Sequence, residues 1–389
     1  MRLFRYVLVA IAALAVPATA NADWQRGVDF ATYAASTYGS AASDASLARA
    51  ASSGNDSVSI VITQYMDSAT SNTVRSNGAT PTDASIPHAI ATALSLGLNV
   101  SLKPQVDLIG GAWRGTIAPA DPTAWFASYE SMIDHYADLA RQGGASTLVI
   151  GTELKTMSGA AYTSRWQQII AGLRQRFSGR LTYAANWNEY QQVRFWDDLD
   201  FIGVDAYYPL SELPAPTVSQ LVSAWTSRGY VSALQAASQQ YGKRVLFTEI
   251  GYRSIVGAAI TPNIWNSQAL YSMDEESNAY EAAFQAFAGR PWFAGMYWWS
   301  WPATLPANGW NSDYTPTYKP AEDVMRSWNR RLGGTVAPAP APVIPAQPVV
   351  APPPQPQRAL PIEHKVVQKK RVVKKRRHAK RHRKARRHR

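Results

Sequence analysis

The sequence contains no cysteine and few histidines. None of its 389 residues is Cys, and only six are His. The absence of Cys excludes disulfide bonds, zinc sites with thiolate ligands, iron–sulfur clusters and thiol nucleophiles. Carboxylates, tyrosines and the few histidines are the reactive groups that remain. No metal-binding or cofactor motif is present, so we expect chemistry without a cofactor.

Charged residues are also scarce, at 17%, whereas hydrophobic residues make up 46%, which is enough for a large buried core. The formal net charge is +12, but it is unevenly distributed. Of the 39 Lys and Arg, 16 lie in residues 335–389 and two in residues 1–22, which leaves 21 against 26 acidic residues in 23–334. The main part of the chain is therefore acidic overall, and we expect no nucleic-acid partner.

Long hydrophobic runs are nearly absent. The apolar run of residues 7–16 follows Arg2 and Arg5 and precedes the small residues Ala20, Asn21 and Ala22. This layout predicts a secretory signal peptide over residues 1–22. A run of this length is too short to cross about 30 Å of hydrocarbon. We therefore expect an exported protein, periplasmic or extracellular, whose mature form has no transmembrane span.

The C-terminal region has the composition of a linker and a tail. Ten of the 27 residues in 335–361 are Pro, which predicts an extended polyproline spacer. Residues 362–389 are dense in Lys, Arg and His and are expected to be disordered. In an exported protein this basic tail would bind an anionic envelope or polysaccharide surface; an inert solvated tail is the alternative.

Residues 23–334 alternate short β-branched or aromatic runs with longer amphipathic stretches. The predicted strands are 27–32, 58–65, 99–106, 147–152, 180–185, 201–205, 245–249 and 294–300, and the clearest predicted helices are 126–139, 166–177, 219–237 and 280–287. Eight such units predict an α/β fold, a (β/α)₈ TIM barrel. A doubly wound open sheet is the alternative, and it is disfavoured because no Gly-x-Gly-x-x-Gly follows the first strand.

Two glutamates stand where a barrel places its reactive groups, at the carboxyl ends of strands. Glu153 follows the fourth predicted strand, and Glu249 closes the seventh, each after an apolar run. If they face each other across the barrel mouth, one can stay protonated as an acid while the other attacks as a carboxylate, as retaining glycoside hydrolysis requires. A single Glu at a strand end is more often a salt-bridged or solvated residue, so the prediction depends on the pair.

This arrangement resembles the clan of (β/α)₈ retaining glycosidases, and within it the chain is most similar to glycoside hydrolase family 113. The resemblance covers most of residues 24–331 and depends on the segments 102–107 (LKPQVD), 151–154 (GTEL), 183–187 (YAANW), 200–208 (DFIGVDAYY), 248–254 (TEIGYRS) and 297–299 (YWW). It implies that Glu153 is the acid/base and Glu249 the nucleophile of a β-mannanase-like enzyme. Thr152 stands where much of the clan has Asn, and Gln105 where we expect His.

Polar residues at other strand ends predict a sugar-binding pocket. Lys103 and Asp107 can bind ring hydroxyls, and Asn186 suits a hydroxyl next to the reacting carbon. Each can equally be a rim salt bridge or a filler of the barrel interior. Asp205 is expected to bind substrate and is the best rival for a catalytic role, while Tyr207 is expected to hydrogen-bond the nucleophile and hold it ionised.

Tryptophans are numerous, at 14, and several fall near the predicted barrel mouth. Those at the end of the eighth strand are Trp298, Trp299 and Trp301, and those in predicted loops are Trp113, Trp187 and Trp310. Because sugars present apolar CH faces that stack on aromatic rings, we expect some of them to bind substrate. About half of such residues are ordinarily core. Trp299 is the first candidate and Trp113 the second, with Trp298 beside them.

These observations predict an exported retaining endo-β-glycosidase that hydrolyses a β-1,4-linked polysaccharide, mannan or glucomannan, by double displacement. Two alternatives stay open. A noncatalytic polysaccharide-binding barrel would be held at the envelope by the basic tail. A transglycosylase acting on an exopolysaccharide would share the first chemical step and replace water by an acceptor sugar.

Overall fold

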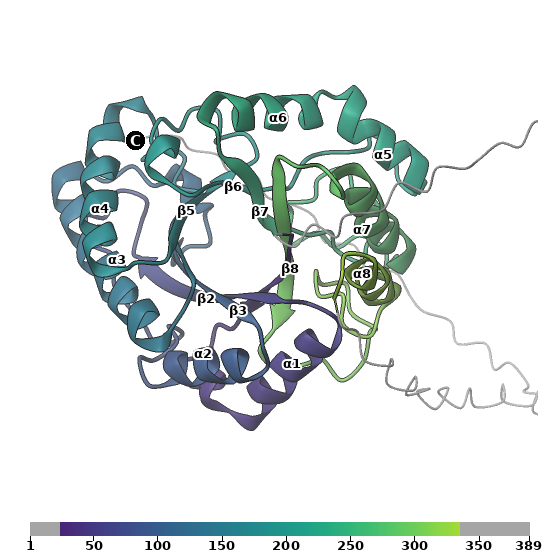
Figure 1. Ribbon diagram of the computed structural model, residues 1–389, viewed down its shortest axis with the longest axis horizontal. Helices are drawn as coiled ribbons and strands as arrows, with labels where there is room; N and C mark the ends of the chain where they lie inside the picture. The colour runs from purple at the N-terminus through teal and green to yellow at the C-terminus, as the bar shows by residue number, and fades with distance from the viewer. Residues whose placement is uncertain (1–23, 335–389) are drawn as a thin grey trace, which may run out of the picture. The chain divides into compact units, whose positions relative to one another are not determined.

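The structure is a computed structural model that describes residues 24–334; the predicted signal peptide, Pro-rich linker and basic tail lie outside the described residues. Eight parallel strands form a closed barrel in sequence order, surrounded by helices (Figure 1). They are β1 (Gln25–Ala31), β2 (Ser57–Met66), β3 (Asn99–Leu108), β4 (Thr147–Thr152), β5 (Arg180–Asn186), β6 (Phe201–Asp205), β7 (Arg244–Ile250) and β8 (Phe293–Pro302). The predicted TIM barrel is confirmed, and both ends of every predicted strand lie within two residues of the ends of the observed strand.

The helices do not follow the regular pattern of one helix after each strand. They are α1 (Ala41–Ser52), α2 (Ser85–Ser95), α3 (Pro122–Gly143), α4 (Thr163–Arg176), α5 (Val218–Ser227), α6 (Tyr230–Tyr241), α7 (Met273–Phe287) and α8 (Pro320–Arg331). The single predicted helix over 219–237 is wrong, because Gly229 adopts a left-handed φ of 78° and divides the segment into α5 and α6. Between β5 and β6 the described chain forms only the 3-10 turn Trp196–Asp198.

Helix α3 illustrates how the sequence sets an element's bounds and its packing. The side chain of Asp121 accepts hydrogen bonds from the backbone of Thr123 and Ala124, and Pro122 occupies the first helical position. The helix is capped at its C-terminal end by Gly144, which has a left-handed φ of 79°. On its buried face, the hydroxyl of Tyr129 donates to the carbonyl of Ile150 at 2.8 Å. This contact anchors the strand that precedes Glu153.

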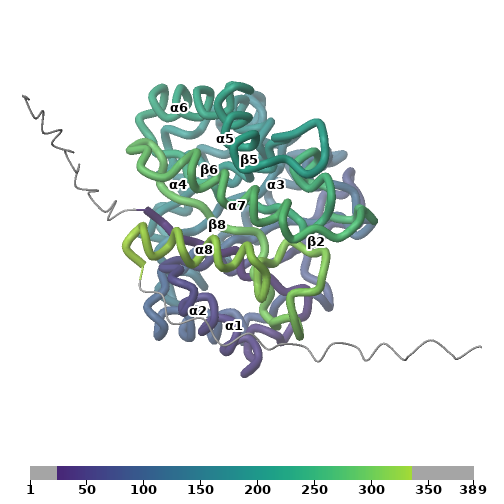
Figure 2. The backbone as a smooth tube through the Cα atoms, turned by 90° about the vertical axis from the view of Figure 1, so that its right-hand side faces the viewer, coloured from purple at the N-terminus to yellow at the C-terminus, as the bar shows by residue number. Residues whose placement is uncertain are grey.

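Helix α8 closes the ring between α7 and α1 (Figure 2). Trp328 of α8 stacks on Phe284 of α7 with ring centroids 5.5 Å apart, and Glu322 of α8 pairs with Arg49 of α1 at 2.6 Å. Helix α8 therefore packs against both the preceding helix α7 and the first helix α1.

The barrel interior is a packed core rather than a pore. Phe201, Leu246 and Tyr297 belong to a buried cluster separate from the main core between barrel and helices. Gly27 makes room for the ring of Tyr297, because a Cβ at this glycine would lie 2.4 Å from that ring. Polar side chains occupy the interior beyond this cluster, toward the carboxyl ends of the strands.

Candidate active site

Glu153 and Glu249 both lie at the carboxyl end of the barrel. Glu153 directly follows β4, and Glu249 is the second-last residue of β7. The strand register places Asn186, Asp205 and Glu249 side by side on β5, β6 and β7. Both glutamates are buried, and the charge of Glu249 contributes to the raised pKa of Glu153. The structure thus brings the two predicted carboxylates into one electrostatic environment.

Glu153 is held in an unusual backbone conformation. Its φ is 51°, in the left-handed region that non-glycine residues rarely adopt, and its amide donates to the carbonyl of Ala184 at 2.7 Å. Trp113 Nε1 donates to Oε2 at 3.0 Å, and Asn186 Nδ2 donates to Oε1 at 2.5 Å. Strain of this kind is typical of functional positions.

The pKa of Glu153 is raised above its ordinary value of 4.5, chiefly by burial. The charge of Arg114 and the hydrogen bonds from Trp113 and Asn186 oppose this shift, and the charge of Glu249 adds to it. The balance favours the neutral acid more than in water, as a proton donor requires.

Glu249 has the opposite surroundings. Lys103 Nζ donates to Oε1 at 2.6 Å, and the hydroxyl of Tyr207 donates to Oε2 at 2.7 Å, which confirms the predicted Tyr207 hydrogen bond. Burial raises the pKa of Tyr207 well above its ordinary range, as does the charge of Glu249, so the hydroxyl keeps its proton and remains a donor. Both carboxylate oxygens are therefore fixed, and one faces a cation.

Lys103 occupies a buried layer of charge beneath Glu249. Its ammonium lies 3.7 Å from both Asp29 and Asp205. Burial alone would lower the pKa of Lys103, but the attraction of the three surrounding carboxylates outweighs it and the pKa is raised. Burial raises the pKa of Asp29 to about 7 and that of Asp205 well above its ordinary range. Lys103 therefore stays a cation, while the two aspartates bind protons readily.

This layer corrects two predictions. Neither Lys103 nor Asp205 has any exposed surface, so the expectation that they bind sugar directly is wrong. Both are fully buried against the charge cluster around Glu249, and Asp205 accepts a hydrogen bond from the hydroxyl of Thr248 at 2.8 Å. Asp29 was missed, although a charged residue inside the apolar run of β1 is a signal that could have identified it.

The tryptophans of β8 divide between the two faces of the strand. Trp299 is half-buried, with its ring centroid 5.9 Å from Lys103 Nζ. Trp298 is 1% exposed and stacks on Tyr280 of α7 at 3.6 Å, so its predicted contact with sugar is wrong. Adjacent strand residues point in opposite directions, and only one of the pair can face the barrel interior. Trp113 is 41% exposed beside Glu153, as a sugar-stacking residue requires.

Asp107 lies at the rim and is paired. Its Oδ1 accepts from Arg114 Nη2 at 2.5 Å, and Arg114 also donates to Gln105 Oε1 at 2.9 Å. Asp107 is therefore part of a salt bridge at the rim, which is the alternative to sugar binding that the sequence left open. Arg114 was missed by sequence reasoning because it lies in the connection after β3, where no periodic pattern marks it.

Glu189 is a third buried glutamate near the site, and it was also missed. It accepts hydrogen bonds from Tyr183 and Ser158, each at 2.6 Å, and from the backbone of Asn186 at 2.8 Å. Burial raises the pKa of Glu189 to about 7. Its contacts hold the end of β5 and hence the amide of Asn186 beside Glu153.

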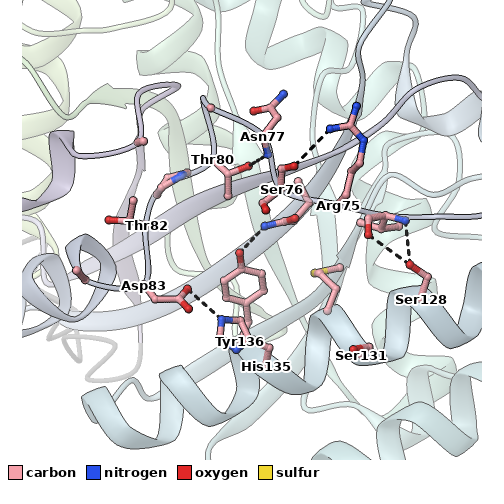
Figure 3. A pocket seen from close by; sticks show the side chains of 17 residues that line it. Arg75, Ser76, Asn77, Thr80, Thr82, Asp83, Ser128, Ser131, His135 and Tyr136 are labelled. Atoms are coloured by element: carbon pink, nitrogen blue, oxygen red, sulfur yellow. Dashed lines mark hydrogen bonds and ion pairs between the residues drawn. The ribbon is translucent and has the colours of Figure 1, made fainter.

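A cavity of about 900 Å³ lies away from these residues, between the β2–α2 connection and α3 (Figure 3). Gln64 donates to the hydroxyl of Tyr136 at 2.5 Å on its wall, and His135 pairs with Asp83 at 3.0 Å. Neither Glu153 nor Glu249 lines this cavity. The active site is therefore identified by its converging carboxylates and donors. Within residues 24–334, no group of three or more His, Asp and Glu side chains is arranged to hold a metal ion.

The chain is similar to known proteins of one family. Residues 29–318 match the model of Glycoside Hydrolase Family 113. The GH113 β-mannanase AaManA from Alicyclobacillus acidocaldarius, solved in complex with ManMIm, is 29% identical, with a TM-score of 0.73 over 80% of this chain and 99% of that chain. A GH113 β-1,4-mannanase solved as a complex is 26% identical, with a TM-score of 0.71 over 79% and 99% of the two chains.

More distant similarity extends to a β-glucuronidase from Faecalibacterium prausnitzii, which is 12% identical with a TM-score of 0.53 over 79% of this chain and 49% of that chain, and shares the fold alone. Curated protein sequences give no match. The family model covers most of the chain, including both strand-end glutamates and their partners. The chain therefore belongs to glycoside hydrolase family 113 and is a glycoside hydrolase.

Proposed function

We propose that this glycoside hydrolase is an exported, retaining endo-β-1,4-mannanase that cuts mannan or glucomannan by double displacement. The observation that carries the mechanism is the contrast between its two buried glutamates. Glu249 is held by an ammonium and a phenol, whereas the pKa of Glu153 is raised. The mannan substrate is supported by the two similar family members, which are named β-mannanases.

In the first step, a carboxylate oxygen of Glu249 forms a bond to the anomeric carbon while Glu153 donates its proton to the glycosidic oxygen, and the bond between that carbon and that oxygen breaks. Lys103 and Tyr207 hold the attacking carboxylate in place. The product of this step is a covalent glycosyl-enzyme on Glu249.

In the second step, the Glu153 carboxylate takes a proton from water, and the water oxygen bonds to the anomeric carbon as the bond to Glu249 breaks. Trp113 and Asn186 donate hydrogen bonds to Glu153, so they stabilise the carboxylate that remains after the first proton transfer. Two inversions restore the original configuration. An acceptor sugar in place of water would give transglycosylation by the same route.

The proposal is tested by incubating the protein with mannan, glucomannan and other β-linked polysaccharides and identifying released oligosaccharides by mass spectrometry. Glu249→Gln removes the nucleophile, and we expect it to lower turnover by about four orders of magnitude. Glu212→Gln is the matched control, because Glu212 is a surface glutamate whose side chain is 86% exposed.

Two results would contradict the proposal. Near-normal product release by Glu249→Gln would exclude Glu249 as the nucleophile. Initial products of inverted anomeric configuration, observed by NMR, would exclude double displacement.

A further inference from the structure

Two loops at the barrel mouth carry exposed aromatic surface that the mechanism does not use. We call them together the rim lobe: residues 251–272 between β7 and α7, and residues 303–319 between β8 and α8. Six of the twelve exposed large hydrophobic side chains in the described chain lie on it: Ile264, Trp265, Leu270, Tyr271, Trp310 and Tyr318. Trp265 is 67% exposed and Trp310 is 70% exposed. Such clustered exposed apolar surface indicates a binding site.

Two aromatic rings of the rim lobe, those of Tyr271 and Trp310, pack on each other before any ligand arrives. Tyr271 from the first loop and Trp310 from the second have ring centroids 5.5 Å apart, tilted by 35°. The hydroxyl of Tyr271 donates to the carbonyl of Gly309 at 2.8 Å, which ties one loop to the other. Tyr318 differs, because its ring is covered by the guanidinium of Arg49 at 3.9 Å.

Arg253 holds the two loops together from within. It is buried, and its guanidinium donates to the carbonyls of Ser312 and Ser267, each at 2.9 Å. Because the guanidinium of Arg253 is hydrogen-bonded to backbone carbonyls of both loops, it fixes the distance between the two loops and adds little charge to the surface of the lobe. The exposed rings therefore sit on a preorganised support, which lowers the entropy lost on binding.

The rim lobe borders the nucleophile. Tyr314 of the second loop donates to the carbonyl of Pro262 in the first at 2.6 Å, and its ring centroid lies 6.2 Å from that of Tyr207, which contacts Glu249. Trp310 precedes Tyr314 by four residues, so at most about 15 Å of backbone separates the two. Trp113 follows β3, four strands from β7 across the eight-stranded barrel. Aromatic residues thus flank the catalytic pair on opposite sides.

The chemistry of the lobe fits a neutral sugar chain. Residues 254–272 and 303–312 of the lobe contain no charged residue, and their polar members are amides and hydroxyls such as Asn263, Asn266, Gln268 and Asn308. The lobe's remaining charged residues are Arg253 and Lys319, which are buried, and Asp313, which is exposed. Aromatic faces match sugar CH surfaces, and amides match sugar hydroxyls. An anionic polymer would find no counter-charge on these stretches.

We propose that the rim lobe binds neutral β-linked polysaccharide beyond the reacting sugar, by stacking on Trp310, Tyr271 and Trp265. The assignment of that chain as the substrate rests on the proposed function, whereas binding itself does not. The lobe gives the enzyme a preference for long chains over short oligosaccharides.

The test uses the full-length protein with the double substitution Trp310→Ala and Trp265→Ala. Leu96→Ala is the control, since Leu96 is an exposed apolar residue that follows α2 at the other end of the barrel. Affinity electrophoresis in gels that contain neutral glucomannan measures binding in a Glu249→Gln background, where the polymer stays intact. A neutral polymer offers no charge to the basic tail. We expect the double variant to bind about tenfold more weakly and the control to bind normally.

Kinetics give a second readout. In the double variant, the ratio of kcat/KM on glucomannan to kcat/KM on a trisaccharide substrate should fall about tenfold, because KM for the polymer rises. Carrying Trp310→Tyr in place of Trp310→Ala in that variant should restore part of the ratio. If no polysaccharide is cut but retardation is lost in the double variant, the proposed function fails and the binding site stands. Equal retardation of variant and unmodified protein overturns the inference. An equal loss of kcat/KM on both substrates also overturns it. So does light scattering that shows the unmodified protein to be self-associated and the double variant to be dissociated, because the exposed rings would then bind a second copy of the chain.

Discussion

Replacing Lys103 by Met tests whether the buried cation controls the nucleophile. The ammonium lies 2.6 Å from Glu249 and 3.7 Å from each of two aspartates. At an effective dielectric constant of about 20, a charge pair at 2.6 Å attracts by about 6 kcal/mol, before the cost of burying the ammonium is subtracted. Removing one partner of a buried pair costs about 3–5 kcal/mol in measured cases. Asp29 and Asp205 can bind protons when the cation is gone, so Glu249 bears most of the loss.

That energy predicts a large loss of rate. At about 1.36 kcal/mol per tenfold change in rate, a loss of about 3–5 kcal/mol lowers kcat/KM by about 10² to 10⁴. The sign follows because the attacking carboxylate has lost the ammonium that holds its oxygen in place.

The assay is kcat/KM on a soluble manno-oligosaccharide from pH 4 to 9, with Lys243→Met as control. Lys243 immediately precedes β7, at the end of the strand opposite Glu249, so the same side-chain change there leaves the charge cluster intact. Melting temperatures across the same range test the cluster independently. With no cation present, the variant should lose stability as pH rises and its carboxyls must ionise. A kcat/KM within threefold of that of the unmodified protein across this pH range would refute the reasoning.

Three further predictions concern Glu153, Glu189 and the tail. Trp113→Phe removes a donor to the Glu153 carboxylate, so the pKa of Glu153 should rise and the alkaline limb of kcat/KM should move up by about one pH unit; a fixed or lowered limb contradicts this. Burial raises the pKa of Glu189 from 4.5 to about 7, so its contribution to stability should fall as pH rises through that range, and Glu189→Gln should make the melting temperature fall less steeply with pH; parallel curves would argue against this role. Full-length protein should bind anionic polysaccharide beads at low salt and be released by added salt, whereas a chain ending at Gly334 should not bind; equal retention of both would remove the tail's proposed role.

The barrel was predictable because its signals are local. Each strand is buried on both faces, so it appears in the sequence as a short apolar run such as the one that precedes Glu153. The same reasoning failed where a single residue decides the geometry. Periodicity over 219–237 continues through Gly229, and only its left-handed φ separates two helices. Likewise, nothing in the run that contains Trp298 and Trp299 specifies which ring faces α7.

The strand-end rule located Glu153 and Glu249, since the position of a residue along a strand decides which end of the barrel it reaches. It could not determine their surroundings. Asp29, Lys103 and Asp205 come from β1, β3 and β6, and they meet only because the sheet closes on itself. The rule also treated Lys103 as a sugar ligand, because its depth below the mouth depends on the tilt and stagger of the closed barrel.

The sequence by itself determined the alternation of strands and helices, the family of the chain, and the two glutamates that end strands, because these depend on residue order and local periodicity. Apart from the hydrogen bond of Tyr207 to Glu249, only the tertiary structure decided which groups surround each glutamate, which tryptophans face the mouth, and how two distant loops form one rim lobe. The physical reason is that burial, charge pairing and hydrogen bonding depend on distances between residues far apart in the chain, and those distances exist only after the barrel has closed.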